Sequence, residues 1–266
     1  MNLGLIARWL CATFAVASLT IAPTASAADV RVMISAGFFE AYSDLAGGFE
    51  RSTGHHLVTI RGPSIGDSPE AIPNRLKRGE PCDVVLMIGA SIDDLARQGL
   101  VRAGTKVDLA RSEIGMVVRV GAAKPDISSV DAFRRTLLEA KSIAYSDSGS
   151  GVYLSTTLFP QLGVADQVMG KSREIKGPPS GEPVAAVVAR GEAEIGFQQV
   201  AELIHVPGIT FVGAIPAQLQ PETFYSGALA SNAAQPEAAQ SLIRFIASPD
   251  AAAAIANAGL TPLAKR

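Results

Sequence analysis

The sequence predicts an α/β protein built as two lobes, each a sheet covered by helices. Short apolar segments with strand character alternate with amphipathic segments of helical spacing, and this alternation is typical of parallel βαβ units. It occurs in two series, before and after about Ile114, with no low-complexity linker between them. One large sheet or two lobes could result, and the lack of a flexible linker favours two lobes joined by crossing strands. A chain of 266 residues with 48% hydrophobic content is long enough for two such lobes.

The first series begins with an apolar strand at residues 30–35. Apolar side chains then recur at helical spacing over 38–52, and Gly54 is expected to end this helix. The remaining elements of the series are strands at 57–60 and 83–88 and helices at 67–78 and 91–98, each helix followed by a glycine.

The second series begins with an apolar strand at 114–119. Ser128 is expected to cap the next helix, since Asp131 follows three residues later in the manner of a capping box. The later elements are strands at 142–146, 173–176, 194–198 and 224–230, and helices at 152–162, 183–190, 236–247 and 249–258.

Residues 1–27 have the pattern of a secretory signal peptide. Arg8 supplies a positive charge, residues 9–22 are almost uninterruptedly apolar, and the small residues at 25–27 fit a cleavage site. A membrane anchor is the alternative, but the apolar stretch is shorter than the ~20 residues that span a bilayer. We therefore expect a periplasmic protein that starts near Ala28 and has no membrane attachment after cleavage.

The composition excludes several classes of partner and chemistry. A formal net charge of −2, the lack of a Lys/Arg-rich run and only 6% aromatic residues argue against binding nucleic acid. Cys82 is the sole cysteine after residue 27, so no internal disulfide is expected, and its apolar context predicts a buried small hydrophobe.

No cofactor or metal is expected. The histidines are His55, His56 and His205, and no spaced Cys, Asp or Glu completes a zinc set with them. The sequence also lacks a phosphate-binding loop, a dinucleotide-binding motif and a hydrolase elbow.

Four strand ends lead into turns that are rich in serine and glycine and that open helices. They lie at 35–37, 62–66, 146–151 and 177–181. Helix N-termini carry free N–H groups and a positive dipole end, which together bind anions. Ordinary helix capping would explain any one of these turns. Together, in an α/β protein whose ligands collect beyond the carboxyl ends of strands, they predict an anion site.

Motifs of one known family recur along the chain. They are the export signal, the Ser-Ala-Gly turn at 35–37, the segments 79–84, 148–151 and 190–196, and the Phe-Ile-Ala-Ser-Pro run at 245–249. In these features the chain resembles the molybdate-type periplasmic solute-binding proteins over essentially all of its mature length. The resemblance implies a type II two-lobed fold in which two crossing strands hinge mixed sheets and the ligand binds between the lobes. We expect residues 28–113 plus 225–266 in one lobe and 114–224 in the other.

The resemblance weakens at positions expected to contact the ligand. Molybdate binders usually have a serine where this chain has Gly37, a tyrosine where it has Gln199, and apolar residues near Glu182. Arg61 also stands just before the second turn. An added arginine, an amide and a carboxylate suit an elongated organic acid better than a tetrahedral oxyanion, although Arg61 and Glu182 could instead be ordinary surface residues.

Residues 34–38 and 145–148 are more similar to the periplasmic aconitate isomerases, a group built on the same frame. That resemblance implies a cofactor-free proton shift across an allylic system, between trans- and cis-aconitate. Such a reaction needs a base beside an acidic methylene, donors that hold the carboxylates, and a closed cleft. Glu182 is the first choice for the base, and Tyr145 and Glu40 are the other acid–base candidates.

Either reading implies a small anionic ligand. We expect a monomer, since nothing in the sequence marks a surface for self-association. The alternative to the isomerase is a binding protein that delivers molybdate, or a related oxyanion or carboxylate, to an ABC permease. The residues expected to contact the ligand are Ser35, Gly37, Arg61, Ser64, Ser148, Ser150, Gly151, Gly181 and Gln199.

Overall fold

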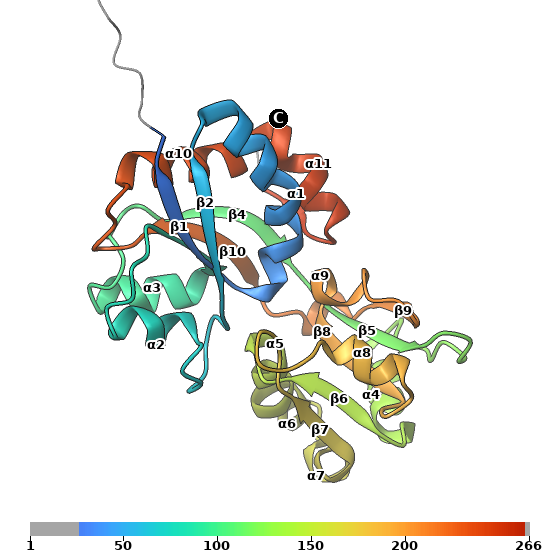
Figure 1. Ribbon diagram of the computed structural model, residues 1–266. Coiled ribbons are helices and arrows are strands. Elements are labelled where there is room, and N and C mark those ends of the chain that lie inside the picture. Colours follow the sequence, from blue (N-terminus) through green and yellow to red (C-terminus); the bar gives the residue numbers. More distant parts are fainter. Residues whose placement is uncertain (1–26, 264–266) are drawn as a thin grey trace, which may run out of the picture.

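The computed structural model describes residues 27–263, so the predicted signal peptide lies outside the described residues except for Ala27. These residues form two sheets, and Figure 1 shows each sheet in its own lobe with its own helices. The predicted α/β class and two-lobed type II architecture are confirmed.

The first sheet has the strand order β11-β4-β10-β3-β1-β2. Strands β1, β2 and β3 are parallel, whereas β10 runs antiparallel between β3 and β4. The bounds are β1 Asp29–Ile34, β2 His56–Arg61, β3 Val84–Ile88, β4 Val107–Ser112, β10 Thr223–Leu229 and β11 Thr261–Pro262.

The second sheet has the strand order β7-β6-β8-β5-β9. Strand β6 is parallel to β7 and β8, and β5 is antiparallel to β8 and β9. The bounds are β5 Ile114–Arg119, β6 Ile143–Ser146, β7 Ser172–Ile175, β8 Ile195–Gln199 and β9 Ile209–Ala214.

Helices cover both faces of each sheet because both faces are apolar. On the first sheet, α1, α10 and α11 pack on one face and α2 and α3 on the other. The second sheet is covered by α4 to α7 on one face and by α8 and α9 on the other. The bounds are α1 Ala36–Thr53, α2 Ile72–Lys77, α3 Gly89–Arg97, α4 Val130–Glu139, α5 Gly149–Tyr153, α6 Phe159–Gln161, α7 Ala165–Val168, α8 Val184–Ala189, α9 Val200–Leu203, α10 Pro236–Ile246 and α11 Ala252–Asn257.

The chain crosses between the sheets twice, and hydrogen bonds tie the crossings together. The first crossing joins β4 to β5, and the second returns from β9 to β10. The Gln220 side chain accepts from the Ile114 N–H at 2.9 Å and donates to the Ile114 carbonyl at 2.8 Å. Buried Ser112 donates to Oε1 of Gln199 at 2.5 Å. We propose the lobe limits 28–113 plus 225–266 and 114–224; strand β10 of the first sheet begins two residues before that second boundary, at Thr223.

The cap of α4 differs from the prediction by one residue. Ser129, not Ser128, accepts the Ala132 N–H on its hydroxyl at 3.1 Å. The Ser128 N–H instead donates to the Asp126 carboxylate at 2.9 Å. That local turn holds Ser128 outside the helix.

The helix predicted at 67–78 is shorter in the structure, where α2 begins at Ile72. The Asn74 side-chain amide donates to the carbonyls of Gly66 and Ser68 at 3.2 and 2.9 Å. These bonds hold the preceding segment as a series of turns.

Two further features bear on the sequence predictions. Cys82 is buried, and burial raises the pKa of its thiol to about 12, as expected for a small hydrophobe. Across residues 27–263, no helix has both the length and the apolarity needed to cross a membrane.

Candidate active site

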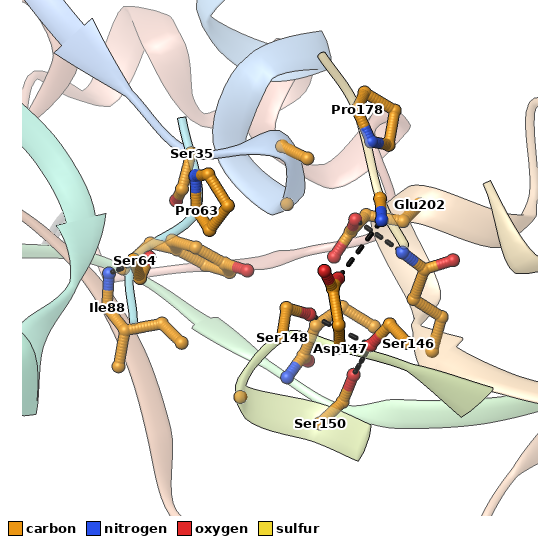
Figure 2. A pocket seen from close by; sticks show the side chains of 17 residues that line it. Ser35, Pro63, Ser64, Ile88, Ser146, Asp147, Ser148, Ser150, Pro178 and Glu202 are labelled. Carbon is orange, nitrogen blue, oxygen red and sulfur yellow. Dashed lines mark hydrogen bonds between the residues drawn. The ribbon is translucent and has the colours of Figure 1, made fainter. Parts of the chain in front are cut away.

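The serine- and glycine-rich turns of both lobes line one cavity between the two sheets. The turn after β1, the turn after β2, the start of α5 and the turn after β7 all contribute. Figure 2 shows Ser35 and Ser64 on one side of this cavity, with Ser148 and Ser150 facing them from the other lobe. The lining residues are Ser35, Ala36, Gly37, Pro63, Ser64, Ile88, Ser146, Asp147, Ser148, Gly149, Ser150, Gly177, Pro178, Gln198, Gln199, Glu202 and Tyr225. We call it the turn cavity.

Ser35 ends β1 and forms the N-cap of α1, an 18-residue helix. Its hydroxyl is buried and has no hydrogen-bond partner among the described residues. It also makes no capping bond to its own helix, so the hydroxyl is free to donate into the cavity. The first-turn N–H groups of α1 add donors and a positive dipole end at the same place.

The turn after β6 supplies a second group of hydroxyls. Ser146 lies within hydrogen-bond distance of Ser148 at 2.8 Å and of Ser150 at 3.1 Å. Gly151 does not line the cavity, but a Cβ atom there would lie 1.6 Å from the Ser146 carbonyl oxygen. A glycine is therefore required for α5 to begin this close to the end of β6.

Ser64 and Asp147 hold their turns in place. The Ser64 hydroxyl accepts the Ile88 N–H at 3.2 Å, which leaves its own hydrogen to donate to a ligand. The Asp147 carboxylate accepts the Gly177 N–H at 3.0 Å and so fixes the turn after β7. Each lobe thus presents donors that are positioned before any ligand arrives.

Glu202, on α9, lies in the turn cavity beside these donors (Figure 2) and is, with Asp147, one of the two carboxyl groups that line it. Oε2 of Glu202 accepts from the Gln198 amide at 2.6 Å. The Gln198 carbonyl in turn accepts the Val184 N–H at 3.1 Å, which fixes the orientation of the amide. Burial between the lobes is the main cause that raises the pKa of Glu202 to about 7, with the Asp147 charge adding to it and Gln198 and Arg61 opposing it.

Tyr225 lies beside Glu202 at the start of the return into the first sheet. Its ring stacks on Phe38 with centroids 5.9 Å apart. Burial, and then the charge of Glu202, raise the pKa of the Tyr225 phenol. The phenol therefore keeps its proton at neutral pH and is a further hydrogen-bond donor.

Five of the predicted ligand contacts line the turn cavity: Ser35, Gly37, Ser64, Ser148 and Ser150. Gln199 lines it too, although its carbonyl oxygen is already bonded to Ser112. Arg61 and Glu40 line a second cavity that shares Ala36, Pro178 and Glu202 with the first.

Four predicted residues line neither cavity: Gly151, described above, and Glu182, Gly181 and Tyr145. Glu182 forms an ion pair with Arg190 at 2.6 Å on the protein surface, and Arg190 holds the pKa of this carboxyl below its usual range. Gly181 lies beside it in an exposed turn. Tyr145 packs into the apolar core of the second lobe, edge-on to Phe159. This geometry does not support the predicted roles of Glu182 and Tyr145 in proton transfer.

Sequence reasoning missed Glu202 and Tyr225. Glu202 follows the central strand β8 by three residues, at the end of the sheet where ligands of open α/β proteins collect. That position was the available signal, but no serine or glycine marked it. Among residues 27–263, no three His, Cys, Asp or Glu side chains gather closely enough to hold a metal ion.

Comparisons with known proteins agree with this architecture. The family model of the bacterial extracellular solute-binding proteins matches residues 30–261. The aconitate isomerase of a Pseudomonas species is 49% identical over 256 residues, covering 94% of this chain and 96% of that protein. The molybdate-binding protein ModA of Azotobacter vinelandii is 25% identical over 238 residues, covering 87% and 89%.

Solved structures share the fold at lower identity. The periplasmic molybdate-binding protein of Azotobacter vinelandii has a TM-score of 0.68 at 22% identity, covering 87% of this chain and 98% of that one. The sulfate-binding protein SubI of Mycobacterium tuberculosis has a TM-score of 0.67 at 18% identity, covering 89% and 87%. At these identities the likeness concerns the fold alone.

Proposed function

This chain belongs to the family of bacterial extracellular solute-binding proteins, and from that premise we propose that it is an aconitate isomerase. Its ligand would be a small carboxylate anion held between the lobes, and the reaction would interconvert trans- and cis-aconitate. The relative that is 49% identical carries that name. One observation in the site carries the proposal: a carboxyl with a pKa of about 7 lies in the cavity that also holds the anion-binding turns.

The reaction moves one proton and one double bond. A base removes a proton from the methylene of trans-aconitate, and the electron pair of that C–H bond forms a new double bond to the central carbon while the original π pair moves to the far carbon. The negative charge spreads over the allylic carbons and onto the attached carboxylates. The proton then returns to the carbon at the other end of the allylic system, which leaves the double bond shifted and no net change in composition.

Glu202 is suited to act as this base. A general base works best when its pKa lies near the working pH, and burial gives Glu202 that value. Its bond to the Gln198 amide fixes the carboxyl at the cavity wall. After the proton has been taken up, the same carboxyl can return it to the far carbon, so no second acid is needed.

The donors of the turns would stabilise the intermediate. The hydroxyls of Ser35, Ser64 and Ser148 and the phenol of Tyr225 line the same cavity as Glu202. Preorganised donors aimed at a developing negative charge lower its free energy most when water is excluded. Closure of the lobes over a bound ligand would meet that condition.

The alternative is a binding protein that delivers an oxyanion to an ABC permease. The serine hydroxyls favour it, because neutral donors are what a tetrahedral anion needs. Glu202 favours the isomerase, since a receptor that only binds and releases an anion has no use for a proton acceptor in the same cavity. In the isomerase reading no permease is required, and we propose that the mature protein acts as a periplasmic monomer.

The test is direct turnover. Purified protein without residues 1–27 is incubated with trans-aconitate, and cis-aconitate is followed by chromatography. Thermal shifts with molybdate, sulfate and tricarboxylates are measured in parallel, because a ligand of the folded state raises the melting temperature. We expect cis-aconitate to accumulate and tricarboxylates to stabilise the protein most. A large increase in melting temperature with molybdate, together with no turnover, would contradict the isomerase and support a binding protein for the permease.

A further inference from the structure

A second cavity adjoins the turn cavity and offers the greater part of the space between the lobes. The turn cavity has a volume of about 30 Å³ and the second about 240 Å³. One water needs roughly 10–15 Å³ measured in this way, so the turn cavity has room for a group about as large as one carboxylate. A tricarboxylate must therefore extend beyond it. Both cavities are bordered by Ala36, Pro178 and Glu202. The part of the ligand that does not fit in the turn cavity would therefore lie in the second cavity.

Arg61 is the cation of this second cavity. It ends β2 directly opposite Ile34, the residue that precedes Ser35. Its guanidinium carbon lies 4.0 Å from the centre of the Phe39 ring, which holds the group flat. Within residues 27–263, Nε of Arg61 is buried and has no hydrogen-bond partner. A guanidinium held in this way keeps its planar edge for a carboxylate.

His205 lines the same cavity three residues after Glu202 and is exposed at its mouth. An imidazole there can donate a hydrogen bond to an anion. Glu40 is the opposing group, an exposed carboxylate at the same cavity wall. The four ionisable side chains of the cavity are thus Arg61, His205, Glu40 and Glu202.

We propose that Arg61 and His205 form a second carboxylate subsite, so that a polycarboxylate lies across both cavities. One carboxylate occupies the turn cavity, another binds Arg61, and the carbons between them pass Glu202, which borders both spaces. This inference rests on the proposed function for the identity of the substrate. It explains what that function requires, because the carbons between two anchored carboxylates are the ones that exchange a proton. A single tetrahedral oxyanion would leave Arg61 without a partner.

The test measures binding apart from turnover. Propane-1,2,3-tricarboxylate has the three carboxylates of aconitate but no double bond, so it binds without reacting. Its dissociation constant is measured by calorimetry for the wild type, Arg61→Ala, Arg61→Lys and His205→Ala. Charge-assisted hydrogen bonds predict ~10- to 100-fold weaker binding for Arg61→Ala. We expect smaller losses for the other two variants, and tighter binding for Glu40→Gln.

Controls in the same lobe separate the subsite from general charge effects. Arg51→Ala removes an arginine from the last turn of α1, roughly 20 Å from the start of that helix. His56→Ala removes an exposed histidine that bonds Glu50. Both should bind the tricarboxylate as the wild type does, and circular dichroism checks that each variant is folded.

The outcomes for the subsite and for the reaction are distinct. Wild-type affinity in folded Arg61→Ala, or no tricarboxylate binding by the wild type, overturns the subsite. Weakened binding in Arg61→Ala together with no conversion of trans-aconitate by the wild type supports the subsite and overturns the isomerase. If the wild type converts trans-aconitate and Arg61→Ala binds the tricarboxylate as tightly as the wild type does, the isomerase is supported and the subsite is not.

Discussion

A Cβ atom on Gly37 would lie 1.8 Å from the hydroxyl oxygen of Tyr225. The tyrosine therefore occupies the space into which any larger residue at position 37 would project. Molybdate binders usually carry a serine in this turn, and here a phenol from the other end of the chain supplies the hydroxyl instead. Tyr225 can occupy this position only because residue 37 is a glycine.

Gly37→Ala should destabilise the protein. Tyr225 is packed against Phe38 and fully buried, so its ring cannot move aside without cost, and overpacking of this kind costs ~1–3 kcal/mol. Gly47→Ala in the same helix is the matched control. Its Cβ would meet only the flexible end of Arg51 at 3.1 Å, and alanine is the better helix former by up to ~1 kcal/mol. Melting temperatures of the two variants should move in opposite directions, and equal shifts would refute the packing argument.

Glu202→Gln and Glu182→Gln separate the two carboxyls that the sequence and the structure favour as the base. Glu202→Gln should lower kcat ~100- to 10,000-fold, the usual contribution of a general base, and leave the protein folded. Glu182→Gln should stay within a few-fold of the wild type, since that carboxyl is paired with Arg190 at the surface. The measurement is conversion of trans-aconitate by each variant. A large loss of activity in Glu182→Gln, with Glu202→Gln unaffected, would identify Glu182 as the base instead.

The rate should depend on pH through the ionisation of Glu202. Only the carboxylate form can accept a proton, so kcat/KM is expected to rise with pH and level off above about 7. An ordinary glutamate would give a rate already constant at pH 6. The profile is measured from pH 5 to 9 at fixed ionic strength. A flat profile over this range would show that Glu202 is not the group whose ionisation controls the rate.

The same pKa predicts a change in stability with a definite sign. A carboxyl whose pKa rises from 4.5 to about 7 on folding binds its proton more tightly in the folded state. The fold therefore loses stability as pH rises through this window, and the penalty is complete above it. Glu202→Gln should melt at a higher temperature than the wild type at pH 8, with a much smaller gap at pH 5. Glu182→Gln should show no such gain, because its carboxyl has a lowered pKa.

Much of the site was predictable because its donors belong to short local patterns. Ser35, Ser64, Ser148 and Ser150 follow strands within a few residues, so their meeting in one cavity follows from the fold class. Arg61 was found as an unusual charge beside one of these turns. Such residues can be predicted from local sequence, because the end of each strand determines where the turn after it lies.

The proton-transfer group was not predictable in the same way. Glu182 stands in a turn that matches the pattern, but Arg190 lies close enough to pair with it at the surface. Glu202 lies in a short helix whose sequence resembles any exposed one. Its burial comes from tertiary packing, in which α9 lies against α1 of the other lobe. The strands β4 and β9 were also missed, since their alternation of apolar and polar residues is weak.

The position of β10 has a consequence for how the polypeptide acquires its shape. This strand lies between β3 and β4 in the sheet. In the chain, however, it follows all five strands of the second sheet, so the ribosome synthesises it after them. Until Thr223 and the residues that follow are available, β3 and β4 each expose an unpaired edge, which invites association with other chains. The segment 114–214 contains all the strands of its own sheet and can assemble early. The lobe that begins the protein is therefore the one that must be completed last.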